Sequence, residues 1–241
     1  MALVRRRLTR RVIGIDRDPA ARRLARARRA CHEVSGDIEA ARGADLVVLA
    51  VPVRQIIALA PRVAPLLAPG GILTDTGSTK SAVCRVLHGI GGHPMCGTER
   101  SGIAAADPRL FEGVPWVLVP GDRTSLRRVA ALVRALGAHP VTMTAAAHDR
   151  AAALASHLPY ALALALSRLA GPRPPLAAGS FRSATRVAAQ PAEMGLDILL
   201  TNRFHIARAA GRMAGVLASL ASALRRGDEA AVRRFVGEGK R

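Results

Sequence analysis

The 241-residue chain contains few aromatic residues and almost no lysine. Aromatic residues make up 2% of it, and Lys80 and Lys240 are its only lysines, so 34 of its 36 basic residues are arginine (36 minus 2). Proteins that bind single-stranded nucleic acids commonly stack bases on aromatic side chains. Because aromatics are scarce and arginine is spread along the chain, we interpret the formal charge of +19 as arginine-rich, solvated helix faces and expect no nucleic-acid partner. The charge favours the approach of acidic small molecules.

Cysteine and long apolar runs are also scarce. Three cysteines without a Cys-x-x-Cys pair argue against a disulfide framework or a metal site and fit a reducing cytoplasm. The most apolar stretch, residues 151–166, is interrupted by polar residues and a proline, and it is shorter than the roughly 20 residues of a membrane span. No apolar leader segment follows Met1. We therefore expect a cytoplasmic protein without a membrane partner.

Short apolar runs alternate with helical patterns in the first part of the chain. This alternation predicts a mostly parallel sheet with helices on both faces. The predicted strands cover residues 12–16, 46–51, 72–75, 116–119 and 141–143, with a turn at Gly70-Gly71 before the third. After about residue 145 only helical periodicity remains, over residues 146–169, 193–224 and 228–236. The sequence predicts an α/β domain at residues 1–144 and an all-helical domain at residues 145–241.

A glycine-rich phosphate-binding turn is missing from the front of this α/β pattern. Residues 12–16 are typical of the second strand of a dinucleotide-binding unit, whose terminal acid binds the adenine ribose. A first strand and a G-x-G-x-x-G turn should precede it, but only 11 residues do, and none is glycine. Either the sequence begins after that strand, which we favour, or the protein lacks it and exposes two strand edges.

Two polar motifs follow the third predicted strand. The first is Asp75-Thr76-Gly77-Ser78-Thr79-Lys80, and the second runs from His93 to Gly102 and contains Pro94, Glu99 and several small residues. Ligands of open parallel sheets bind where strands end and loops begin. The two motifs therefore indicate an active site at the carboxyl edge of the sheet.

These motifs resemble the prephenate/arogenate dehydrogenase family of tyrosine biosynthesis. The matching pieces come in family order and cover nearly the whole chain: Gly14-Ile15-Asp16, Ala50-Val51-Pro52, residues 75–80, residues 93–102, Ser156-His157-Leu158-Pro159 and Thr185-Arg186-Val187-Ala188. The resemblance implies a Rossmann-like domain, here without its first strand and glycine-rich turn, followed by a helical dimerisation domain. It implies NAD(P)-dependent oxidative decarboxylation of prephenate to 4-hydroxyphenylpyruvate by a homodimer.

The resemblance assigns His93 as the catalytic base and Ser78 as its hydrogen-bond partner at the substrate hydroxyl. A neutral imidazole suits proton abstraction near pH 7. The residues alone also allow Ser78 to be a helix cap.

Four further residues are implied to bind the substrate. Arg186 matches an arginine that grips a carboxylate, for which a planar guanidinium is suited. Thr98 and Glu99 are placed at the pocket mouth, and His157 is placed in the pocket. The alternatives are a solvated face for Arg186, a surface position for Glu99 and a core position for His157.

The cofactor is implied to bind Asp16, Val51, Pro52, and the turn formed by Thr76, Gly77 and Ser78. An acid at the position of Asp16 favours NAD, because it accepts ribose hydroxyls and repels a 2′-phosphate. The neighbouring Arg17 could pair with that phosphate, so NADP stays the less favoured alternative.

Two departures from the family pattern fall in the helical half: Tyr160 replaces a second histidine, and Gly195 replaces a tryptophan. They leave open whether prephenate or arogenate is the substrate. An inactive paralogue that dimerises without binding a dinucleotide is a further alternative. The run from His93 to Gly97 argues against a related β-hydroxyacid dehydrogenase, which would use a lysine base.

Overall fold

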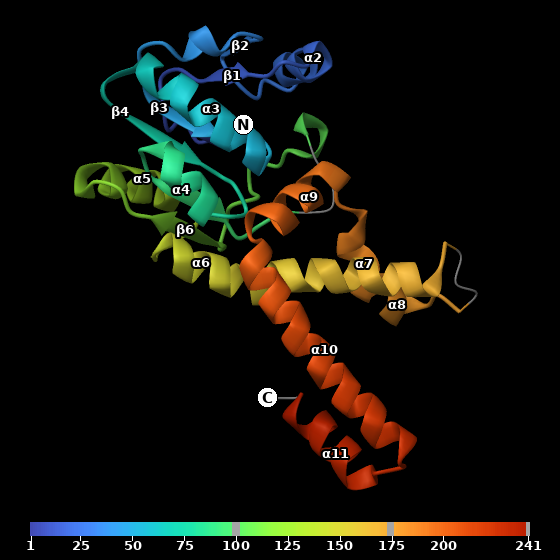
Figure 1. The fold of residues 1–241 in the computed structure, drawn as a ribbon. Helices are drawn as coiled ribbons and strands as arrows, with labels where there is room; N and C mark the ends of the chain where they lie inside the picture. The colour runs from blue at the N-terminus through green and yellow to red at the C-terminus, as the bar shows by residue number, and fades with distance from the viewer. Residues whose placement is uncertain (98–101, 173–175, 240–241) are drawn as a thin grey trace.

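The computed structural model describes residues 1–97, 102–172 and 176–239, and its N-terminal half alternates strands with helices (Figure 1). The strands described there form three hydrogen-bonded groups: β1 (Ile13–Ile15) with β2 (Glu33–Ser35), β3 (Ala44–Leu49) with β4 (Leu67–Asp75), and β5 (Gly91–Pro94) with β6 (Pro115–Val119) and β7 (His139–Thr142). All paired strands are parallel except β5 and β6, and a bridge from Thr74 to Ile90 joins β4 to the third group. The prediction of a mostly parallel sheet is confirmed.

The helices of this half are α1 (Ala2–Arg5), α2 (Pro19–Ala27), α3 (Val53–Val63), α4 (Ser81–Leu87) and α5 (Arg123–Ala135). Two of them, α2 and α5, begin at an aspartate that caps the helix. The Asp18 carboxylate caps α2 by accepting from the backbone N–H of Ala20 at 2.8 Å, and Pro19 occupies the first turn. Asp122 caps α5 in the same way through the N–H of Ser125.

Three local predictions about strands were wrong. Strands β2 and β5 were not predicted, and Gly70-Gly71 lies inside β4 instead of forming a turn. Strand β5 carries no β-branched residue, so its sequence lacks the usual signal. Its glycines are required by crowding: a Cβ on Gly91 would lie 2.6 Å from Cys84 Sγ, and one on Gly92 would overlap the carbonyl oxygen of Asp75. Pairing with β6 and close packing against α4 and β4 therefore determine this strand.

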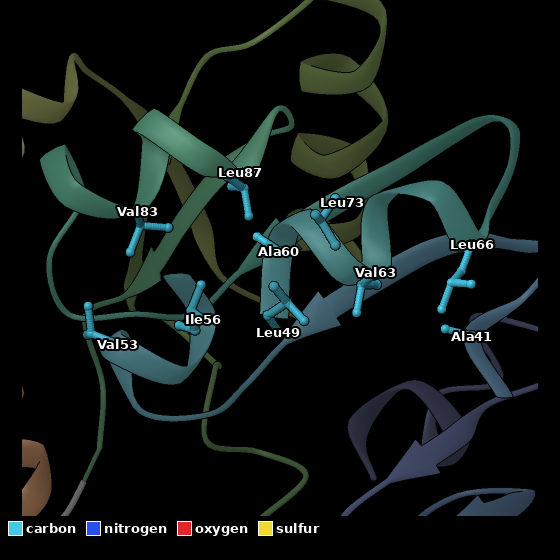
Figure 2. Packing of buried hydrophobic residues seen from close by; sticks show 10 residues of the cluster. All are labelled: Ala41, Leu49, Val53, Ile56, Ala60, Val63, Leu66, Leu73, Val83 and Leu87. Carbon is cyan, nitrogen blue, oxygen red and sulfur yellow. The ribbon is translucent and has the colours of Figure 1, made fainter. Parts of the chain in front are cut away.

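A hydrophobic core between the sheet and two helices holds this edge in place. Figure 2 shows side chains of α3 pointing toward β3 and toward α4. Ile56 and Ala60 of α3 are fully buried, as is Val83 of α4, and Leu49 and Leu73 meet them from the strands. Burying an aliphatic side chain contributes about 1.5–3 kcal/mol. The core fixes α3 and α4 against the carboxyl ends of β3 and β4.

The segment before β1 packs as a helix and a short extension. Ala2, Leu3 and Leu8 pack in the cluster that contains Val133 of α5 and Leu136, which directly follows that helix. The Arg6 guanidinium reaches Glu112 at 2.5 Å. Strands β1 and β3 belong to separate hydrogen-bonded groups.

The second half of the described chain is helical. Its helices are α6 (Ala145–Ala152), α7 (Leu158–Ala170), α8 (Gly179–Thr185), α9 (Ala192–Thr201), α10 (Arg203–Arg225) and α11 (Glu229–Glu238). Figure 1 shows α10 leading away from the sheet, with α11 folded back beside it. Within the described ranges, no helix combines the length and the hydropathy that crossing a bilayer requires.

Two irregularities interrupt the predicted long helices. A π-helical turn, Ala153–His157, separates α6 from α7, and Asn202 (φ −114°, ψ 24°) separates α9 from α10. The predicted continuous helices over residues 146–169 and 193–224 are therefore wrong at these points. Helix α8 and the following 3₁₀ turn, Arg186–Ala189 (η5), were not predicted. Both interruptions lie beside the polar cluster described next.

Candidate active site

A buried carboxylate organises the turn that follows β4. Asp75 is fully buried and accepts hydrogen bonds from the backbone N–H of Gly77 at 2.7 Å and of Gly92 at 3.0 Å. It also forms an ion pair with the fully buried Lys80, whose Nζ donates to the Gly92 carbonyl at 2.6 Å. Because these contacts join the turn to β5, they fix the position of the strand that carries His93.

His93 lies on β5 with 8% of its surface exposed, and a second histidine contacts it. His93 Nδ1 is 2.7 Å from Nε2 of His148, and Nδ1 of His148 is 2.9 Å from the Asp149 carboxylate. Asp149 in turn accepts from the backbone N–H groups of Lys80 and Ser81 at 2.7 and 2.8 Å. The side chains of Asp149 and His148 therefore connect the first turn of α4 with the ring of His93.

The electrostatic surroundings keep the His93 ring neutral. Burial lowers its pKa well below 6.5, and the neighbouring His148, Lys80 and His157 lower it further, against a raising effect of Asp149. Burial alone would raise the pKa of Asp149, but hydrogen bonds from His148, Ser81 and the backbone hold it at about 2. A neutral imidazole backed by a carboxylate can accept a proton.

His157 lies in the π-helical turn and is 1% exposed. Its Nδ1 is 3.0 Å from the side-chain nitrogen of Asn202, which also donates to the Asp149 carbonyl at 2.8 Å. The pKa of His157 is lowered to about 4, mainly by burial and also by His148, against smaller raising effects of Asp149 and of the Ser78 backbone. The ring therefore lies beside the turn that ends in Ser78.

The predicted cofactor residues of two strands meet at one edge. The backbone N–H of Thr76 donates to the Leu49 carbonyl at 3.1 Å, which brings the turn 76–78 beside the end of β3. Val51 is half-buried and Pro52 is exposed just before α3. Ser78 is half-buried, and the alternative of Ser78 as a helix cap is wrong, because Lys80 occupies the cap position of α4. The Asp149 carboxylate supplies the cap from α6.

Asp16 lies directly after β1, at the carboxyl edge expected for a ribose ligand. Its side chain is exposed, and Oδ1 accepts from the backbone N–H of Asp18 at 2.9 Å. Arg22 donates to the Asp16 carbonyl at 2.6 Å, which fixes the turn. The carboxylate thus keeps acceptor capacity toward solvent, and the ends of β1, β3 and β4 provide groups suited to a dinucleotide.

The remaining predicted substrate residues are placed as follows. Arg186 begins η5, which packs against α7, and its side chain is exposed. Thr98 and Glu99 lie outside the described residues. The structure therefore brings His93, His157 and the Ser78 turn together, and it attaches Arg186 to the helix that continues from His157.

The two departures from the family pattern contact each other. Tyr160 lies one turn after His157 and is 6% exposed, and Gly195 faces it from α9. A Cβ at Gly195 would overlap the Tyr160 hydroxyl, so only glycine fits beside this tyrosine in its observed position. The substitutions compensate each other in volume beside the predicted pocket.

An ion pair ties the helical half to the cofactor edge. Asp197 of α9, 2% exposed, accepts from the backbone N–H of Arg54 at 3.0 Å and pairs with its guanidinium. Arg54 lies in the first turn of α3, whose N-cap residue, Pro52, provides no side-chain cap. Asp197 therefore supplies the missing cap from another domain.

Sequence reasoning missed three residues of this site, namely His148, Asp149 and Asn202. Apart from the contact between the adjacent His148 and Asp149, their partners are 45 to 69 residues away in the chain, and none of the three lies in a recognisable motif. The one usable signal was the adjacent His-Asp pair in a helix that is otherwise rich in alanine.

Comparison with known proteins supplies the family. The family model described as prephenate dehydrogenase, nucleotide-binding domain, matches residues 1–143, and the one described as prephenate dehydrogenase, dimerization domain, matches residues 144–238. A cyclohexadienyl dehydrogenase of Zymomonas mobilis is 36% identical over 206 residues, covering 78% of this chain and 70% of that protein. A prephenate dehydrogenase of Lactococcus lactis is 33% identical over 85% of this chain and 61% of its own length.

A solved structure agrees with the sequence matches. The prephenate dehydrogenase of Aquifex aeolicus, in complex with hydroxyphenyl propionate and NAD⁺, is 27% identical, with a TM-score of 0.91 over 99% of this chain and 90% of that one. The matches cover both halves of the chain in the order in which the fold presents them. The chain belongs to the prephenate dehydrogenase family of oxidoreductases, with a nucleotide-binding domain followed by a dimerisation domain.

Proposed function

We propose that the chain catalyses the NAD-dependent oxidative decarboxylation of prephenate to 4-hydroxyphenylpyruvate. The observation that carries this proposal is the neutral, buried His93 ring beside the carboxyl end of β4, backed by His148 and Asp149. The NAD⁺ and hydroxyphenyl propionate bound by the Aquifex aeolicus relative support the same chemistry.

His93 acts as the base in this proposal. Its ring nitrogen takes the proton from the ring hydroxyl of the substrate as a hydride leaves the carbon that bears this hydroxyl. The bond to the carboxylate then breaks to release carbon dioxide, its electron pair aromatises the ring, and the phenolate oxygen takes the proton back. A nicotinamide bound at this edge would supply the acceptor for that hydride. Ser78 orients that hydroxyl. Burial of His93 keeps water away from the reacting atoms.

The other predicted residues bind the two ligands. Arg186 pairs with a substrate carboxylate, and His157, Thr98 and Glu99 bind the same ligand. Asp16 accepts the ribose hydroxyls of NAD, which it favours over NADP by repelling a 2′-phosphate. The loops at Val51-Pro52 and at Thr76-Gly77-Ser78 hold the remainder of the cofactor.

We place the function in a cytoplasmic homodimer, with the division between domains at residues 144 and 145. The description of the second family model supports dimerisation through the helical domain. Large apolar side chains are exposed along α10, and their burial against a second copy would stabilise the assembly: Phe204, Val216, Leu217 and Leu224.

Formation of NADH at 340 nm, with prephenate or arogenate as substrate, tests the proposal. We expect turnover with prephenate and NAD⁺. His93→Asn should turn over about a hundred to ten thousand times more slowly, which is the loss typical of a missing general base. His139→Asn, which changes an exposed histidine on β7, is the matched control and should keep the full rate. Full activity of His93→Asn, or turnover confined to arogenate, would contradict the proposal.

A further inference from the structure

Two buried histidines of the site each carry one ring nitrogen that makes no hydrogen bond within the described residues. The hydrogen bond at one nitrogen of a neutral imidazole decides which nitrogen carries the proton. His93 and His157 both engage a partner through Nδ1. The partner at Nδ1 therefore decides whether Nε2 is a base or a donor.

The partner of His93 makes its Nδ1 a donor. The Asp149 carboxylate only accepts, so the His148 nitrogen 2.9 Å from it carries a proton. In a neutral His148 ring the other nitrogen, Nε2, is then an acceptor. It lies 2.7 Å from Nδ1 of His93, which must donate to it. Nε2 of His93 is left with a free lone pair.

The partner of His157 has the opposite effect. A backbone carbonyl only accepts, so the 2.8 Å contact of Asn202 with the Asp149 carbonyl fixes which end of the amide is nitrogen. The same nitrogen lies 3.0 Å from Nδ1 of His157, which must therefore accept. The proton of His157 is on Nε2, which is fully buried. The Ser78 backbone lies near this ring and raises its pKa, although Nε2 meets no acceptor at full hydrogen-bond geometry in the described residues.

We propose that Asp149 and Asn202 are positioning residues that hold His93 and His157 in opposite tautomers. The Asp149 carboxylate acts on His93 through His148. The Asp149 backbone carbonyl orients the Asn202 amide, which in turn acts on His157. His93 then offers a bare nitrogen for a hydroxyl proton, and His157 directs its N–H toward the turn that ends in Ser78, where the substrate hydroxyl is proposed to bind. This assignment of ligand groups rests on the proposed function, whereas the tautomers do not.

This arrangement needs no rearrangement during proton transfer. The substrate proton bonds to Nε2 of His93, whose Nδ1–H continues to donate to His148. The new positive charge faces His148, Lys80, His157 and the Asp149 carboxylate, of which only the carboxylate stabilises it. The opposite tautomer of His93 would carry its proton on Nε2, so it would have no lone pair there to accept the substrate proton.

Nitrogen NMR of the histidine rings in the intact protein, recorded without ligand at pH 7.5, tests the tautomers directly. We expect the proton on Nδ1 in His93 and on Nε2 in His157. In His148→Gln the amide oxygen can still accept from His93, so the tautomer should persist and kcat should fall less than tenfold. In His148→Leu the acceptor is lost, and kcat should fall about 100-fold with little change in KM.

A second variant tests the contact between Asn202 and His157. Asn202→Asp replaces the donor with an acceptor, so His157 should move its proton to Nδ1, and KM for prephenate should rise more than kcat falls. A wild-type His93 with its proton on Nε2, as a doubly protonated His148 would produce, overturns the inference. Equal activity of His148→Gln and His148→Leu overturns it as well. An inactive wild type with the expected tautomers would reject the proposed function alone.

Discussion

Two strands of this sheet end in an aspartate, and the two carboxylates have opposite surroundings. Asp16 follows β1, is exposed and accepts a hydrogen bond from its own turn. Asp75 ends β4, is fully buried and holds two backbone N–H groups and the Lys80 ammonium. The same residue type at equivalent strand ends is a ligand group in one place and a structural support in the other.

The neighbours of each carboxylate explain the difference. Strand β5 runs beside β4 and covers Asp75, and Lys80 returns to it five residues later along the chain. Strand β1 has only the short β2 as a paired neighbour in the described residues. A strand-end acid therefore becomes a support when another strand extends past it.

The largest effect should come from breaking the buried pair. Asp75→Asn or Lys80→Met leaves the other charge buried without its partner, so we expect each to lower the free energy of unfolding by about 3–5 kcal/mol. Urea denaturation measures this loss. An effect below about 1 kcal/mol for both variants would mean that Asp75 is no more a support than Asp16.

The next largest effect should be a loss of folding stability in acid, caused by protonation of the buried His157 ring. The folded pKa of His157 is about 4 and the unfolded value is near 6.5, so between these pH values the unfolded chain binds more protons. Stability contributed by the neutral ring is intact above pH 6.5 and falls by about 3 kcal/mol as the pH drops to 4.

Denaturation of wild type and His157→Gln across pH 4–7.5 checks this dependence. The variant lacks the titrating ring, so its stability should fall less steeply below pH 6.5. Parallel curves for the two proteins would contradict the assignment.

The smallest effect should come from the exposed carboxylate. Asp16→Asn removes a charged acceptor of the ribose hydroxyls, so we expect KM for NAD⁺ to rise about tenfold, equivalent to about 1.4 kcal/mol. The free energy of unfolding should change by less than about 0.5 kcal/mol, because the side chain is exposed. If Asp16→Asn lowered the free energy of unfolding as much as Asp75→Asn does, the two strand ends would not differ in role.

The sequence predicted the parts of this fold that depend on local pattern. The apolar runs of β3 and β6 are local signals, and the structure has those strands. Strand β5 and the break at Asn202 depend on segments packed from elsewhere, so a local pattern could not reveal them. The roles of His93, Ser78 and Arg186 came from motif resemblance and stay predictions.

The π-helical turn between α6 and α7 makes this site sensitive to chain length. A residue advances an α-helix by about 100°, so the extra residue of such a turn sets the rotation between Asp149 and His157. Deleting one alanine of this turn would restore regular α-helical winding, but it would rotate the His157 ring away from the Asn202 amide. The number of residues in this turn is therefore as important for the site as their identity, because it decides whether His157 can reach Asn202.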